Sequence, residues 1–283
     1  MKSKNELLFG SKMLTDHFNN YLLAQVSIVN GVIRENILEG RAKEIRAAIA
    51  STMNTAIAIA KLGKDVEFYN ECVMLARGFF ERIVNICYLL VCDDDKFEEY
   101  RLHTKQKAYR RLEQEFYAGD KKMCLKFIGK KEPATHSELD EALKKFSTKS
   151  GKEKKRWPDI SIPERIKLIG ERSKVNIGLF LHYQVSIYTD ASEALHGSFY
   201  GLTFHIGAYS PNIDIKNKTE IEQNLQKNFT LLFWSSGDLV QQLLVILAKD
   251  NAVSEQLKYS TKNSNKSLEI MKAAMKEADE NNK

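Results

Sequence analysis

Apolar residues recur every three or four positions along most of this chain, which is the spacing of one face of an α-helix. Few residues interrupt the pattern, because the 283 positions include only four prolines and fourteen glycines. The pattern predicts an all-α fold, a multi-helix bundle with long antiparallel helices. The predicted helices cover about 5–29, 33–61, 66–91, 96–117, 121–128, 137–146, 175–195 and 220–247.

Local signals place several ends of the predicted helices. Ser161 followed three residues later by Glu164 forms a capping box, and Pro163 suits the first turn of the helix that starts there. Gly197 suits the left-handed position that ends a helix. The stretch 201–215 mixes β-branched residues with Gly and Pro, so we expect irregular or briefly extended backbone.

The order of these segments predicts three parts. Residues 1–65 supply N-terminal helices that pack on the core, and 66–250 form a helical core domain that carries the polar motifs. Within this core, the Lys- and Ser-rich stretch 147–159 reads as a basic linker. Residues 251–283 form a charged C-terminal helix or tail, which we expect to fray from about 267.

Composition narrows the class of protein. With 43% hydrophobic residues, the chain has ample material for a packed interior. The four cysteines show no C-x-x-C pairing, which favours free thiols in a reducing cytosol over disulfides or zinc. The longest apolar stretch, around 83–91, is interrupted by Asn85 and is too short to span a bilayer. We therefore expect a cytoplasmic protein without a membrane segment.

Positive charge is concentrated in 101–156, where seventeen Lys and Arg stand against eight Asp and Glu. Aromatic residues such as Tyr109 are interleaved with these cations. Such a stretch attracts phosphate backbones and stacks on bases, so it predicts a partner such as RNA or a nucleotide, bound in part by Arg101 and Tyr109. The alternative is a solvated helix face followed by a loop, and no RRM or KH signature is present.

Two helical stripes place polar residues one turn apart among apolar neighbours: Arg77 with Glu81, and Tyr188 with Ser192 and His196. A charge near a core must be paired or must line a working cleft. The first interpretation is that the stripes converge, with Arg77, Glu81 and His196 as catalytic groups and Tyr188 and Ser192 binding the substrate. The alternative is an intrahelical ion pair and a histidine with a structural role.

Other chemistries find little support in the sequence. The phosphate loops G-x-x-x-x-G-K-[ST] and G-x-G-x-x-G, the metal motif H-E-x-x-H and the hydrolase motif G-x-S-x-G do not occur. The acidic run at 93–95 stands at a helix start, where negative charge stabilises the helix dipole. We therefore expect neither a cofactor nor a bound metal.

Three short motifs follow one another in a fixed order: R-x3-E, W-x3-S-x3-R and Y-x3-S-x3-H-G-S. Their residues are Arg77, Glu81, Trp157, Ser161, Arg165, Tyr188, Ser192, His196, Gly197 and Ser198. Over about 66–199, this succession resembles a family of uncharacterised bacterial helical proteins, catalogued as a domain of unknown function. The resemblance implies an all-α fold and marks Arg77, Glu81, Tyr188, Ser192 and His196 as the site.

A looser resemblance is to the HEPN helical bundles, many of which are metal-independent ribonucleases of bacterial defence and toxin systems. Their R-x4-6-H motif is missing here. The mechanism would need Arg77 and His196 to meet from different helices, so that His196 accepts the ribose 2′-hydroxyl proton while Arg77 stabilises the phosphorane.

Three hypotheses follow for the function. The first is a ribonuclease-like or other phosphate-directed effector of a defence or toxin system, with a homodimer as one option. The second is a non-catalytic sensor or adaptor that binds an anionic ligand or a protein partner. The third is a structural role, in which the stripes only fix the register of packed helices.

Overall fold

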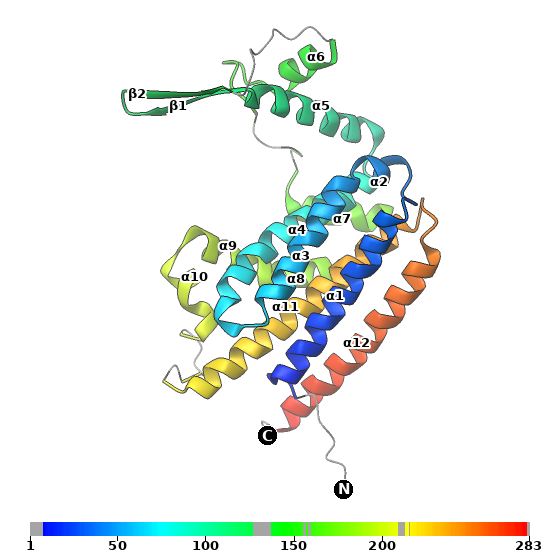
Figure 1. The fold of residues 1–283 in the computed structure, drawn as a ribbon, viewed down its shortest axis with the longest axis vertical. Coiled ribbons are helices and arrows are strands. Elements are labelled where there is room, and N and C mark those ends of the chain that lie inside the picture. The colour runs from blue at the N-terminus through cyan, green and yellow to red at the C-terminus, as the bar shows by residue number, and fades with distance from the viewer. Residues whose placement is uncertain are drawn as a thin grey trace. The chain divides into compact units, whose positions relative to one another are not determined.

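The computed structural model describes residues 8–126, 137–154, 157, 160–208, 213–214 and 216–281. The chain divides into two compact units (Figure 1). The first unit combines Met1–Val91 with Arg165–Lys283, and the second is Cys92–Glu164. The domain boundaries expected at 65 and 250 both fall inside the first unit.

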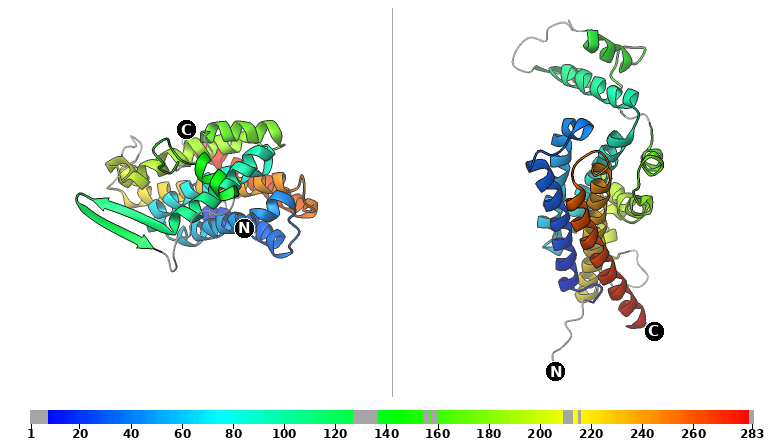
Figure 2. Two further views of the ribbon diagram at one scale, coloured as in Figure 1. Left: turned by 90° about the horizontal axis from the view of Figure 1, so that it is seen from above. Right: turned by 90° about the vertical axis from the view of Figure 1, so that its right-hand side faces the viewer.

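Among the described residues, five long helices build the first unit: α1 (Lys12–Arg34), α3 (Arg46–Leu62), α4 (Tyr69–Val91), α11 (Lys218–Leu247) and α12 (Ser254–Asn281). Helix α1 packs against α3, α11 and α12, and α4 packs against α3 and α11 (Figures 1 and 2). Helix α3 runs opposite to α1 and α4, and α12 runs opposite to α11 (Figure 1). Large buried side chains fill the interior, among them Phe18, Phe79, Phe80, Phe180, Tyr183, Phe229 and Phe233. The predicted helical bundle is confirmed.

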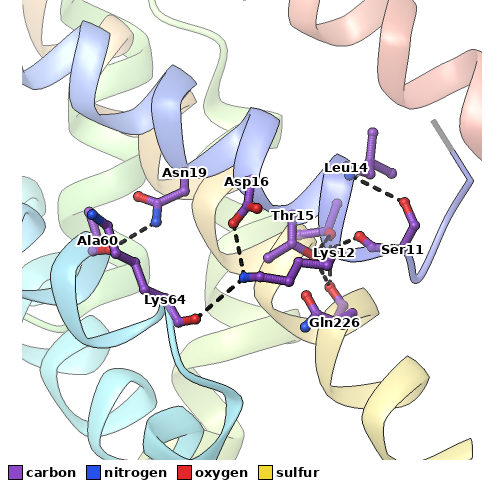
Figure 3. A network of polar contacts seen from close by, with 10 residues as sticks. Ser11, Lys12, Leu14, Thr15, Asp16, Asn19, Ala60, Lys64 and Gln226 are labelled. Atoms are coloured by element: carbon purple, nitrogen blue, oxygen red, sulfur yellow. Dashed lines mark hydrogen bonds and ion pairs between the residues drawn. The ribbon is translucent and has the colours of Figure 1, made fainter. Parts of the chain in front are cut away.

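Buried polar groups fix α1 between its neighbours (Figure 3). Thr15 Oγ1 donates a hydrogen bond of 3.0 Å to the Gln226 carbonyl of α11. On the other side, Asn19 Nδ2 donates one of 2.9 Å to the Ala60 carbonyl of α3. A buried polar group without a partner would cost free energy, so these bonds favour one position of α1 in the bundle.

The single helix predicted over 33–61 is divided in the structure. Helix α1 continues to Arg34, a short helix α2 covers Gly40–Glu44, and α3 starts at Arg46. The break falls at Asn36, whose backbone is left-handed with φ of 54°. A left-handed residue ends an α-helix, and Asn tolerates that conformation better than most side chains.

The helix predicted over 175–195 exists as a continuous helical run. It consists of α8 (Ile177–Tyr183), a π-helical segment (Gln184–Tyr188) and α9 (Thr189–His196). Gly197 ends the run in the left-handed conformation, as predicted, with φ of 67°. Helix α7 (Ile162–Arg172) precedes it and begins at the predicted capping box, where the Glu164 carboxylate accepts from the Ser161 N–H at 2.7 Å.

The expectation of irregular or extended backbone at 201–215 is wrong for its first residues. Helix α10 (Phe199–Thr203) and a 3-10 turn (Phe204–Ile206) occupy them. The Ser198 hydroxyl caps α10 by accepting from the Gly201 N–H at 3.0 Å, which offsets the cost of a short helix. Positions 209–212 and 215 lie outside the described residues.

The second unit contains helix α5 (Asp94–Arg111), strands β1 (Glu113–Ala118) and β2 (Lys121–Lys126), and helix α6 (Ser137–Lys145). The strands pair antiparallel, with Glu113 opposite Lys126 and Ala118 opposite Lys121. The helical predictions for 112–117 and 121–126 are therefore wrong, whereas α6 was predicted correctly. The reason is the two-residue Gly119-Asp120 turn, since Gly119 adopts the positive φ of 60° that tight hairpins require.

A small core holds the helices of the second unit together. It consists of Leu102, Ala142 and Phe146, with Trp157 packed against it. In the stretch predicted as a linker, Ser147 and Glu153 form an isolated β-bridge. Positions 155, 156, 158 and 159 of that stretch lie outside the described residues.

By its length and composition, helix α11 could cross a membrane. However, 83% of its most apolar window is buried inside the bundle. This burial is typical of the central helix of a helical core.

Candidate anion-binding site

A stripe of three polar side chains runs along one face of α4. Arg77, Glu81 and Asn85 stand at i, i+4 and i+8, so successive members are one helical turn apart. Helix α4 packs against both the π-helical segment and α9. That packing brings Tyr188, the last residue of the π-helical segment, onto the polar stripe.

The Glu81 carboxylate is the centre of this contact. Arg77 Nε donates to Glu81 Oε1 at 3.3 Å, and the Tyr188 hydroxyl donates to the same oxygen at 2.7 Å. The Arg77 guanidinium also lies over the Tyr188 ring, 5.4 Å from its centroid. The Arg77 side chain is 20% exposed and that of Glu81 is 40% exposed, so the group lies at the edge of the core and in reach of solvent.

A second arginine approaches the same stripe from α7. Arg165 Nη1 donates a hydrogen bond to Asn85 Oδ1, one turn beyond Glu81 on α4. Burial lowers the pKa of Arg165 below its ordinary value, and the charge of Glu81 counteracts that effect. Two guanidinium groups therefore reach the same stripe of α4, and we define the polar cluster as Arg77, Glu81, Asn85, Arg165 and Tyr188.

Two further observations concern the hydrogen-bond donors of the polar cluster. Arg77 Nη1 is buried and has no hydrogen-bond acceptor among the described residues. A buried donor without an acceptor costs about 1–3 kcal/mol, so it needs an explanation such as a ligand. Burial and donation to Glu81 also raise the pKa of Tyr188, so this hydroxyl stays protonated and remains a donor at neutral pH.

The π-helical segment that carries Tyr188 is itself a local irregularity. The Thr189 N–H bonds to the Gln184 carbonyl, five residues back instead of four. Such a turn is less favourable than α-helix and occurs often at functional sites, where it changes the direction of a side chain. Here the last residue of the segment, Tyr188, is the one that contacts Glu81.

Ser192 and His196, the other two residues of the second predicted stripe, do not join this contact with Glu81. Ser192 Oγ donates to the Tyr188 carbonyl at 3.0 Å, so its hydroxyl is used within the helix. His196 lies in the exposed last turn of α9, about 12 Å further along the axis than Tyr188. Within the described part of the chain, no hydrogen bond or ion pair joins His196 to Arg77 or Glu81. The structure thus brings Arg77, Glu81 and Tyr188 together, while His196 stands apart.

Arg101 and Tyr109, expected to bind substrate, both lie on α5 in the second unit. Arg101 pairs with Glu98 at 2.9 Å and lies over the Phe97 ring, 5.0 Å from its centroid. Many cations of the basic stretch are similarly paired with carboxylates: Lys105 with Glu138, Lys107 with Glu153, Lys122 with Glu115, Lys126 with Glu113, and Lys145 with Glu99. This pairing lowers the field that the stretch presents to a polyanion.

No group of three or more His, Cys, Asp or Glu residues within the described residues is arranged to hold a metal ion. Three of the cysteines are buried and Cys124 is exposed, and no disulfide links them in the part described. Burial raises the pKa of Cys72 to about 12, which makes that thiol unreactive at neutral pH.

Sequence reasoning had not assigned Asn85 and Arg165 to the site. Asn85 continues the spacing of Arg77 and Glu81 by one more turn, a signal that was available in the sequence. Arg165 ends the W-x3-S-x3-R motif, whose members separate in the structure. Trp157 packs in the small core of the second unit, Ser161 caps α7, and Arg165 reaches α4.

Together these features define the chain as a helical-bundle protein with an arginine-rich polar cluster on the face of α4 that meets α7 and α9. A family model matches residues 45–213, more than half of the chain, and the chain belongs to this family, the family of unknown function DUF5677. The resemblance to a family of unknown function is thereby confirmed. The matched region contains every member of the polar cluster. Neither a curated protein nor a solved structure matches the chain.

Proposed function

We propose that the polar cluster binds a phosphate group, carried by a nucleotide or by RNA. The observation that carries this proposal is the buried Arg77 Nη1, a guanidinium donor without an acceptor among the described residues, on the helix stripe that Arg165 also reaches. The Arg77 side chain is only 20% exposed, and an anion interacts with a cation more strongly at such a position than in water.

The donor chemistry favours phosphate among anions. A guanidinium group presents several N–H donors in a planar fork, and that geometry suits phosphate oxygens. Glu81 engages Arg77 through Nε, and Arg77 Nη1 is a buried donor without an acceptor in the described chain. Contacts with Glu81 and Tyr188 hold the guanidinium in place before a ligand arrives, which reduces the entropy cost of binding.

Binding is better supported than cleavage. General acid-base catalysis needs a proton acceptor within hydrogen-bond reach of the reacting hydroxyl, directly or through one water. His196, the expected proton acceptor, lies about 12 Å along the helix from Tyr188. The function supported best is therefore that of a cytoplasmic phosphate-binding sensor or effector, and a ribonuclease reaction remains a separate hypothesis that depends on His196.

Isothermal titration calorimetry with AMP and with adenosine tests the proposal, because the two ligands differ only in the phosphate. We expect AMP to bind and adenosine not to bind. Arg77→Met and Arg165→Met should each weaken AMP binding about tenfold or more, the loss expected for one charge-assisted hydrogen bond. Inorganic phosphate and a short single-stranded RNA, titrated in the same way, distinguish a general phosphate site from a nucleotide or RNA site.

Arg82→Met is the matched control for these variants. Arg82 stands on the same helix, is exposed, and donates to Thr55 Oγ1 at 2.8 Å, away from the polar cluster. This variant should bind AMP like the wild type. Equal affinity of the wild type for AMP and adenosine would contradict the proposal. An equal loss of AMP affinity in all three arginine variants would also contradict it.

The cleavage hypothesis has its own readout. Incubation of end-labelled RNA with wild type and His196→Ala shows whether any cleavage exists and whether it needs the imidazole. If RNA stays intact while AMP binds, the protein binds phosphate without cleaving RNA. If the wild type cleaves RNA and His196→Ala does not, the result favours the ribonuclease hypothesis.

A further inference from the structure

The small sheet of the second unit has two strands among the described residues, and both of its edges are free. Strands β1 and β2 pair with each other and with no further strand of the described chain (Figure 1). Every second residue of an edge strand directs its backbone N–H and C=O groups away from the sheet, where they can pair with another chain. A two-stranded hairpin is only marginally stable by itself, so a third strand would stabilise it.

The two free edges differ in their protection against such pairing. Lysine and proline are residues that commonly block an edge strand. Strand β2 carries three exposed lysines, Lys121, Lys122 and Lys126, whereas β1 carries neither lysine nor proline. The edge of β1 is therefore the one that remains open to a partner.

A groove of about 460 Å³ runs along β1. Residues 113–116 of β1 line one side of it, and the remaining lining residues are Lys107, Arg110 and Arg111 of α5 together with Glu153. No described residue of β2 lines this groove, so it lies on the side of β1 that faces away from β2. The groove and the open edge of β1 therefore coincide.

The groove retains positive charge that no carboxylate of the described chain pairs with. Its three carboxylates are each paired with a lysine: Glu113 with Lys126, Glu115 with Lys122, and Glu153 with Lys107. Arg110 donates to two neutral groups, Gln106 Oε1 at 2.8 Å and Ser147 Oγ at 2.6 Å. Arg111 is exposed and forms no ion pair within the described residues. Two guanidinium charges are therefore available to a ligand.

We propose that the groove binds an extended acidic peptide of a partner protein, which joins the sheet as a third strand beside β1. The open edge requires a partner with a row of backbone donors and acceptors, and an extended peptide provides one. Carboxylate side chains of the peptide form charge-assisted hydrogen bonds with Arg110 and Arg111.

A peptide accounts for more of the groove than a nucleic acid does. RNA would use the two guanidinium groups, but it has no backbone amides to pair with the N–H and C=O groups of β1. The groove belongs to the second unit, and binding of a peptide there does not depend on phosphate binding by the polar cluster.

Fluorescence anisotropy with a labelled peptide tests the proposal on the full chain. The probe is Thr-Val-Glu-Val-Glu-Val-Thr with blocked ends, since its alternating valines favour an extended chain. A comparison peptide carries Lys in place of both Glu. We expect the acidic peptide to bind and the basic peptide to bind at least about tenfold more weakly.

Arg111→Glu should weaken binding of the acidic peptide about tenfold or more, because it replaces an attractive charge with a repulsive one. Lys121→Glu is the matched control. Lys121 is also exposed and belongs to the same hairpin, but it lies on β2, so this variant should bind like the wild type. Circular dichroism of both variants checks that the fold is retained.

Two N-methylated peptides test the strand pairing itself. Alternate residues of a strand point their backbone groups to opposite edges, and only one edge of the peptide faces β1. N-methylation of the three valines in one peptide, and of the two glutamates in the other, should therefore abolish binding in one case and leave it intact in the other.

Several results would overturn the proposal. One is a wild type that does not bind the acidic peptide or binds the basic one equally well. Another is an equal effect of Arg111→Glu and Lys121→Glu, or equal behaviour of the two methylated peptides. Displacement of the probe by a short oligouridylate at lower concentration than by unlabelled peptide would assign the groove to RNA instead.

Discussion

The Tyr188 hydroxyl donates a hydrogen bond of 2.7 Å to the Glu81 carboxylate, across 107 positions of sequence. This bond ties the π-helical segment to α4. Arg77 Nε donates to the same oxygen, Glu81 Oε1. One carboxylate therefore orients both the phenol of Tyr188 and the guanidinium of Arg77. Arg77, Glu81 and Tyr188 therefore form a connected network, in which the loss of one member changes the others.

Tyr188→Phe should lower the free energy of unfolding by about 1 kcal/mol, because the ring contacts remain while a bond to a half-exposed carboxylate is lost. Tyr259→Phe is the control, since Tyr259 is exposed on α12. Urea unfolding followed by circular dichroism measures both. If the two substitutions have the same effect, the bond contributes nothing to stability.

Glu81→Gln should strengthen AMP binding several-fold, because it removes a negative charge that lies 3.3 Å from Arg77 Nε and competes with a phosphate for that guanidinium. The effect should shrink as salt is added, since screening weakens interactions between partly exposed charges. Calorimetric titrations at low and high salt measure both changes. Weaker binding at low salt would mean that Glu81 acts mainly by positioning Arg77.

A buried carboxyl elsewhere in the bundle makes stability depend on pH. Asp238 of α11 is 4% exposed, accepts from Tyr21 at 2.6 Å and from Ser264 at 3.0 Å, and burial raises its pKa to about 6. The unfolded value is about 3.9, so the folded protein binds this proton more tightly. The carboxyl therefore stabilises the fold below about pH 4, and this contribution of about 3 kcal/mol is lost as the pH rises through 6.

Asp238→Asn removes that titration while keeping an acceptor for Tyr21 and Ser264. Relative to the wild type, the variant should gain up to about 3 kcal/mol in free energy of unfolding between about pH 4 and pH 7.5. Urea unfolding of both proteins at several pH values gives the comparison. Two parallel stability curves would show that Asp238 does not titrate in this range.

Close packing around Gly237 gives a purely steric prediction. A Cβ atom at Gly237 of α11 would lie 2.5 Å from the Tyr21 ring, whereas one at Gly31 of α1 would meet nothing within 4 Å. Gly237→Ala should therefore cost about 1–3 kcal/mol by overpacking. Gly31→Ala should gain up to about 1 kcal/mol from helix propensity. Thermal unfolding of the two variants should shift in opposite directions, and a shift in the same direction would contradict the packing described for Tyr21.

Much of the fold could be predicted from the sequence, because helical periodicity and caps are local signals. The capping box at Ser161 and the left-handed Gly197 are cases in which neighbouring residues alone decide the conformation. The hairpin of β1 and β2 was missed because its Glu, Gln, Lys and Leu residues favour helix, while pairing and the Gly119 turn decide the outcome.

The site was harder to predict than the fold. The spacing of Arg77 and Glu81 pointed to one face of α4, but the contact of Arg165 with Asn85 joins positions 80 residues apart and no local pattern indicates it. For His196 the spacing indicated a shared helix face with Tyr188, but not a contact with Arg77 or Glu81. Residues that share a helix face still separate by 1.5 Å per position, so two turns place a side chain beyond the reach of direct contact.

The central claim is that Arg165 and Arg77 bind a phosphate group, and the difference in affinity between AMP and adenosine tests it most directly. In the wild type we predict a clear preference for AMP, and in Arg165→Met that preference should fall about tenfold while the affinity for adenosine stays unchanged. The account would be contradicted if the wild type bound AMP and adenosine with equal affinity. It would also be contradicted if Arg165→Met kept the full preference for AMP.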